Sequence, residues 1–201
     1  MSGRREEIVL ATLELASENG LRSVSMQQIA DRVGITKASL YNHFPSKKDI
    51  VLAMYETLRQ ASKDRASITA VDYKELALKG TMKEVLTAAV DSYRTIVRDP
   101  EMFKFYAIIE SERPIEPVAA GIMVKETQTM VEATSSLLKA LESEGKASFL
   151  DLESAAFSFA MAIHSAIDYE FDLMKAGMDT TPAMFGACID EFCRTYGTGK
   201  D

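Results

Sequence analysis

The sequence is poor in the residues that build metal centres and disulfide frameworks. Its 201 residues include two cysteines, two histidines and no tryptophan. Cys188 and Cys193 lie five positions apart, so a helix would point them to different faces and no disulfide framework can form. Neither paired cysteines nor a His-Glu-x-x-His spacing is present to supply metal ligands. We therefore expect no metal and no cofactor.

Long apolar runs are also missing. No segment approaches the ~20 residues that span a bilayer. The first residues lead directly into an amphipathic pattern and not into an apolar signal region. We therefore expect a cytoplasmic protein with no membrane partner.

Negative charge prevails overall, and basic residues outnumber acidic ones only near the N-terminus. The net charge is −7, yet residues 1–65 hold ten basic and eight acidic side chains, which leaves −9 for residues 66–201. Residues 20–50 hold five basic and two acidic side chains. A basic end on an acidic body favours phosphate contacts through the basic end alone.

Helical periodicity runs through almost the whole chain, and strand-like alternation is absent. Glycines and prolines fall where helices would end. The pattern predicts an all-α fold of about nine helices. They are expected at residues 5–18, 26–33, 37–44, 46–65, 82–98, 100–112, 118–144, 152–176 and 182–196, with a weaker segment, 66–80, as a linker.

Two short helices near the N-terminus are joined by a tight turn. Ser25 is followed three residues later by Gln28, which is the spacing of a capping box at the start of the helix at 26–33. Gly34 can end that helix, and Thr36 is positioned to cap the next one. Two short helices joined by about three residues, with glycine in the turn, form a helix-turn-helix.

The helix at 37–44 divides into a buried stripe and a polar face. Leu40 and Phe44, together with Ile35, are expected to anchor it. Polar side chains on the outer face can bond to phosphates and base edges, and an alanine methyl can touch a thymine methyl. We predict that the DNA contacts are Ser25, Thr36, Lys37, Ala38, Ser39, Tyr41, Asn42, His43 and Lys47. The alternative is a three-helix unit whose polar face is only solvated.

These residues resemble the TetR (AcrR-type) family of transcriptional regulators. The resemblance covers residues 5–60 and rests on Ala11, Leu15, Gly20, Ser25, Ile29-Ala30, Gly34-Ile35-Thr36, Leu40-Tyr41, His43-Phe44 and Ser46-Lys47. It implies a DNA-binding domain at residues 1–65, with a linking helix at 46–65, and a larger helical domain at 66–201 that senses a ligand and dimerises.

The resemblance also assigns roles within the reading helix. It implies that phosphates are contacted by Tyr41, His43 and Lys47. It implies that bases or nearby phosphates are contacted by Thr36, Lys37, Ala38 and Asn42. Ala38 stands where many members have glycine, and Asn42 where many have an aromatic residue, so the preferred DNA sequence cannot be transferred from a relative.

The same resemblance implies a homodimer. In this dimer the last two long helices form a four-helix bundle with their counterparts in the second copy. The helix at 152–176 is apolar nearly all round and must therefore be covered on all sides. Apolar residues recur at three- and four-residue steps in the helix at 182–196. The expected dimer interface consists of Phe157, Phe159, Ile163, Phe185, Ile189 and Phe192.

Methionine and aromatic residues are concentrated outside the basic domain and could line an adaptable apolar pocket. His164 and Asp168 are four residues apart, so the carboxylate could orient the imidazole. The expected pocket residues are Met102, Phe103, Tyr106, Met123, Thr127, Met130, Met161, His164 and Asp168. The alternative is that each of these residues belongs to the core.

Together these patterns predict a sequence-specific DNA-binding transcriptional regulator. We expect a repressor that a small apolar or aromatic effector releases from a palindromic operator in double-stranded DNA. A constitutive DNA-binding dimer without a ligand is the alternative. An enzyme is not expected, because Ser165 would point about 100° around the helix from His164 and could not be activated by it.

Overall fold

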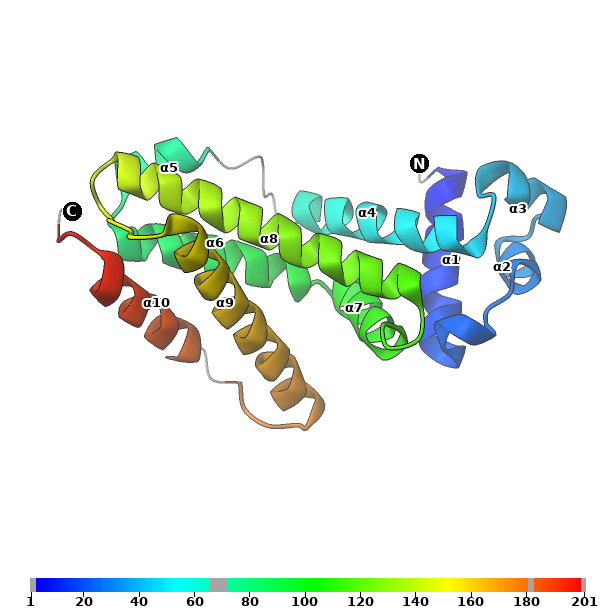
Figure 1. The fold of residues 1–201 in the computed structure, drawn as a ribbon. Coiled ribbons are helices and arrows are strands. Elements are labelled where there is room, and N and C mark those ends of the chain that lie inside the picture. Colours follow the sequence, from blue (N-terminus) through cyan, green and yellow to red (C-terminus); the bar gives the residue numbers. More distant parts are fainter. Residues whose placement is uncertain (1–2, 66–71, 181–182, 200–201) are drawn as a thin grey trace. The chain divides into compact units, whose positions relative to one another are not determined.

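The computed structural model describes residues 3–65, 72–180 and 183–199 (Figure 1). Within these ranges the chain forms ten α-helices, one short 3-10 helix and no strand, so the predicted all-α fold is confirmed. Their bounds are Arg4–Asn19 (α1), Leu21–Ser23 (η1), Met26–Val33 (α2), Lys37–His43 (α3), Lys47–Arg65 (α4), Tyr73–Lys79 (α5), Met82–Val97 (α6), Pro100–Glu112 (α7), Pro117–Ser143 (α8), Leu152–Lys175 (α9) and Ala183–Tyr196 (α10). None of the described helices is both long and apolar enough to cross a membrane.

One α-helix was not predicted. Residues 66–80 were expected to form a linker, but Tyr73–Lys79 is α5. The side chain of Asp72 caps this helix by accepting the backbone N–H groups of Lys74 at 2.9 Å and Glu75 at 3.1 Å. Residues 66–71 of the expected linker, and the expected helix start at Pro182, lie outside the described residues. The other helix ends lie within one residue of their predicted positions.

Two compact units make up the chain. The first contains Met1–Ile68 and Ile96–Glu126, and the second contains Thr69–Thr95 and Thr127–Asp201. The helices α1 to α4, α7 and the start of α8 therefore belong to the first unit. The roles assigned above to residues 1–65 and 66–201 stay a prediction.

The first unit is built around α1, which contacts α2, α4 and α7. Apolar residues at three- and four-residue steps place Ile8 and Leu13 of α1 in the core, where both are buried. They share this core with Ile29 of α2, Leu40 of α3 and Phe105 of α7. Full burial of each such side chain contributes roughly 1.5–3 kcal/mol, so this core stabilises the packing of α3 on α2.

The second unit centres on the packing of α9 against α10. The ring centroids of Phe159 and Phe192 lie 4.6 Å apart, and those of Phe192 and Tyr196 lie 4.8 Å apart. Cys188 and Cys193 are both free thiols on α10. The tilted contact between Phe159 of α9 and Phe192 of α10 therefore helps to hold the two helices together.

Candidate nucleic-acid interface

The capping box at the start of α2 is present as predicted. The Ser25 hydroxyl oxygen accepts the backbone N–H of Gln28 at 3.3 Å, and the Gln28 side-chain oxygen accepts the backbone N–H of Ser25 at 2.8 Å. These bonds satisfy two backbone donors that the first turn of a helix leaves without partners. Ser25 thus sets the position of α2 while remaining exposed.

The turn between α2 and α3 also follows the sequence prediction. Gly34 has φ 72° and ψ 35°, the left-handed conformation that glycine adopts without steric cost. The Thr36 hydroxyl oxygen then accepts the backbone N–H of Ser39 at 3.1 Å and caps α3. Both signals act within four residues, so the start of α3 is determined locally.

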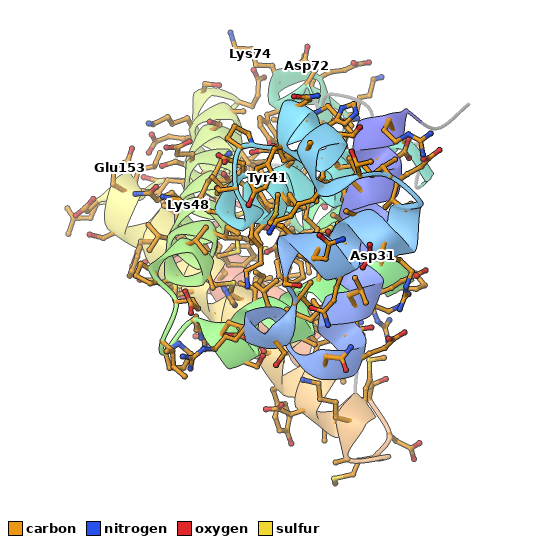
Figure 2. All side chains as sticks on the ribbon, turned by 90° about the vertical axis from the view of Figure 1, so that its right-hand side faces the viewer. Asp31, Tyr41, Lys48, Asp72, Lys74 and Glu153 are labelled. Atoms are coloured by element: carbon orange, nitrogen blue, oxygen red, sulfur yellow. The ribbon has the colours of Figure 1, made fainter. Side chains whose placement is uncertain are left out.

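One face of α3 is anchored and the other is exposed (Figure 2, where Asp31 and Tyr41 mark α2 and α3). Leu40 and Phe44 are fully buried, whereas Ile35 is only half-buried. Tyr41 is 45% exposed. Of the other predicted contacts, Ser39, His43 and Lys47 are half-buried, and Ser25, Thr36, Lys37, Ala38 and Asn42 are exposed.

Arg5 of α1 holds the C-terminal end of α3, a role that sequence reasoning missed. Its guanidinium donates to the backbone oxygen of His43 and lies 4.0 Å from the ring centroid of Phe44. A cation at this end also matches the negative end of the helix dipole. Arg5 is therefore a positioning residue for the exposed face of α3.

Lys47 bonds to the protein's own backbone. Its ammonium donates to the carbonyl oxygens of Leu21 and Val24, each at 3.0 Å, and of Arg22 at 3.4 Å. Three acceptors match the three N–H groups of an ammonium. Lys47 thus ties the start of α4 to the segment that leads into α2. This positioning role and the phosphate contact predicted from the sequence are alternatives.

Ion pairs reduce the free positive charge of residues 20–50. Arg32 pairs with Glu14 at 3.2 Å and with Glu18 at 3.3 Å, and Arg22 pairs with Glu116 at 3.7 Å. Lys37 and Lys48 are exposed and make no ion pair within the described ranges. The charge available to phosphates is therefore smaller than the count of basic residues indicates.

The nine predicted pocket residues divide between the two units. Four lie in the first unit (Met102, Phe103, Tyr106 and Met123) and five in the second (Thr127, Met130, Met161, His164 and Asp168). All are buried or half-buried. The expected pairing of His164 with Asp168 is present, with Nδ1 and Oδ2 3.4 Å apart. Their assembly into one pocket stays a prediction.

A buried ion pair in the second unit escaped the sequence analysis. The Arg94 guanidinium of α6 lies 2.6 Å from a carboxylate oxygen of Glu170, which is fully buried on α9. It also lies 4.1 Å from the ring centroid of Phe185 on α10. No short-range spacing connects three residues so far apart in sequence, so only the fold reveals the cluster.

Dimerisation through α9 and α10 stays a prediction. Five of the six residues expected at the interface are buried within the single chain, namely Phe159, Ile163, Phe185, Ile189 and Phe192. Part of this burial comes from the contact between Phe159 of α9 and Phe192 of α10, whose ring centroids lie 4.6 Å apart. Phe157 is the exception and is 55% exposed.

Comparison with known proteins agrees with this architecture. The profile described as "Bacterial regulatory proteins, tetR family" matches residues 8–54, which include α2, α3 and the turn between them. The HTH-type transcriptional activator FasR of Mycolicibacterium smegmatis is 28% identical over 138 residues, or 67% of this chain and 58% of that protein. The HTH-type transcriptional repressor KstR2 of Rhodococcus jostii is 35% identical over 95 residues, or 47% of this chain and 39% of that protein.

The likeness in fold extends further than the likeness in sequence. The solved structure of the "Flavonoid-responsive Regulator FrrA" superposes with a TM-score of 0.74 at 20% identity and covers 98% of each chain. The profile match, the curated relatives and this shared fold agree. Residues 8–54 thus match the DNA-binding domain of the TetR family, and the chain shares the fold of a regulator that is 20% identical to it.

Proposed function

We propose that this protein regulates transcription by binding a specific sequence of double-stranded DNA. The observation that carries the proposal is the face of α3, which Leu40 and Phe44 anchor from behind and which presents Lys37, Tyr41 and Asn42 outward. A helix held in this way can enter the major groove, where such side chains reach base edges and phosphates.

The contacts divide by position on α3 and its neighbours. Lys37, Ala38 and Asn42 are proposed to meet bases or nearby phosphates, and Tyr41, His43 and Ser25 to meet phosphates. Ser25 stands at the N-terminus of α2, where the helix dipole favours an anion. Thr36, Ser39, Arg5 and Lys47 are proposed to hold the reading face in position, Thr36 and Ser39 through the cap that joins them.

Two copies of the chain are proposed to pair through the exposed face of α9. Phe157 and Tyr169 are more than half exposed on this helix, and Ser158, Ala162 and Ser165 are exposed between them. Small residues between large apolar ones allow two helices to approach closely. A two-fold dimer presents two copies of α3, which favours a palindromic operator.

A small apolar or aromatic effector is proposed to release the dimer from its operator. The name of FrrA states that it responds to flavonoids, which supports an aromatic effector. FasR is an activator and KstR2 is a repressor, so relatives of both kinds exist. Repression is our proposal, and a constitutive DNA-binding dimer is the second candidate.

Selection of binding sites from a random DNA pool tests the proposal. We expect the purified protein to enrich a palindrome. Lys37→Ala and Asn42→Ala should change the enriched bases, because both residues lie on the exposed face of α3. Lys104→Ala, an equally exposed lysine on α7, is the matched control and should change nothing. A pool that stays random would contradict the proposal.

A further inference from the structure

A groove of about 560 Å³ runs between α4 and the first turns of α8, within the first unit. Sites for small molecules have volumes of roughly 300–1,000 Å³. None of the predicted pocket residues lines this groove. Its lining consists of Lys48, Leu52, Ala53, Tyr55 and Glu56 of α4 and Pro117, Val118, Gly121, Ile122 and Lys125 of α8.

The walls of the groove are mainly apolar. Leu52 of α4 is 42% exposed, and Val118 of α8 is half-buried in the same lining. Gly121 leaves the wall hollow, because a Cβ atom built there would meet no other atom within 4 Å. An apolar ligand that covers Leu52 and fills the space at Gly121 would gain free energy from the area removed from water.

The two ends of the groove differ in charge. At the far end Glu56 forms an ion pair with Lys125, whose ammonium also lies 5.3 Å from the ring centroid of Tyr55. At the other end, beside the start of α8, Lys48 is exposed (Figure 2). Lys48 makes no ion pair in the part of the chain that the structure describes. One end is thus neutral and the other positive.

We propose that this groove binds a small amphipathic anion, with its carboxylate at Lys48 and its apolar body along Leu52, Val118 and the space at Gly121. Lys48, at one end of a mainly apolar groove, favours a ligand with an anionic head and an apolar tail. The inference goes beyond the proposed function, because it concerns neither α3 nor the predicted pocket.

Calorimetric titration of the full chain with decanoate, in the absence of DNA, tests the site. Decanoate should bind, and decanol, which has the same tail without the charge, should bind at least about fivefold more weakly. Lys48→Gln should weaken decanoate by about fivefold and leave decanol unchanged. Lys104→Gln, a lysine equally exposed on α7, is the matched control and should leave both unchanged.

Gly121→Leu is the decisive variant. Its side chain would occupy the groove, whereas the backbone of α8 favours leucine over glycine, so the variant should melt no lower than the parent. Decanoate affinity should fall by about tenfold or more. Decanoate binding that survives Gly121→Leu would place the ligand elsewhere and overturn the proposal, as would the absence of any binding to the parent. Neither result bears on DNA binding, since no DNA is present.

Discussion

Removal of the Lys47 ammonium distinguishes a positioning role from a phosphate contact. Lys47→Met keeps most of the apolar stem and removes the three donors that hold the carbonyl oxygens of Leu21, Arg22 and Val24. The segment from Leu21 to Val24 leads directly into the cap of α2, so its release should loosen the entry to the helix-turn-helix.

The expected magnitude follows from the geometry. A hydrogen bond to a charged group contributes about 1.5–3 kcal/mol when buried, and Lys47 is half-buried with one ammonium shared among three acceptors. The variant should therefore lose about 1–2 kcal/mol of unfolding free energy. Operator affinity should fall by a similar factor at every salt concentration, about fivefold to tenfold, because the number of phosphates contacted does not change.

Fluorescence anisotropy with labelled operator at a series of potassium chloride concentrations measures the affinity and its salt dependence, and thermal denaturation measures the stability. Each phosphate contact contributes about 0.9 to the slope of log affinity against log salt, so a lost contact in each half of a dimer would lower the slope by about 1.8. Lys47→Met should leave the slope unchanged. Lys37→Met, the matched control on the exposed face of α3, should lower it. A lowered slope for Lys47→Met, with an unchanged melting temperature, would refute the positioning role.

Three further outcomes are expected. Phe157→Glu should convert the dimer to a folded monomer in sedimentation, whereas Phe192→Glu, at a side chain that is 9% exposed, should unfold the chain; a folded, dimeric Phe157→Glu protein would move the interface away from α9. Glu170→Gln should cost about 1.5–3 kcal/mol in urea denaturation, because it removes the buried carboxylate and leaves Arg94 its ion pair with Asp91 at 3.3 Å, and a loss below about 1 kcal/mol would contradict this. Burial and a neighbouring carboxylate raise the pKa of Tyr55 above its usual 10.0, so this tyrosine ionises first in the unfolded chain and stability should fall as the pH rises above 10. Tyr55→Phe should reduce that fall in denaturation measured from about pH 8 to 11.

The parts of the fold that the sequence predicted are those determined within a few residues. Ser25 with Gln28, Gly34, and Thr36 act over three or four positions, and the bounds of α2 and the start of α3 agree with the prediction. The expected pairing of His164 with Asp168 has the same short range. The missed helix α5 depends on one capping side chain in a segment whose periodicity is weak, so a length of seven residues gave too little pattern to identify.

The sequence leaves open which partner covers a given apolar or charged group, and this has one physical origin. An apolar face predicts that something must cover it, but a neighbouring helix of the same chain and a second subunit satisfy that requirement equally well, as Phe192 shows. A lysine likewise predicts an anionic partner or an acceptor, and Lys47 found backbone carbonyl oxygens, which every residue carries and no sequence pattern marks. Arg5 is held in the same way by the backbone oxygen of His43. Side chains that bond to side chains or caps can therefore be predicted from residue types, whereas side chains that position α3 through the backbone become visible only when the chain is folded.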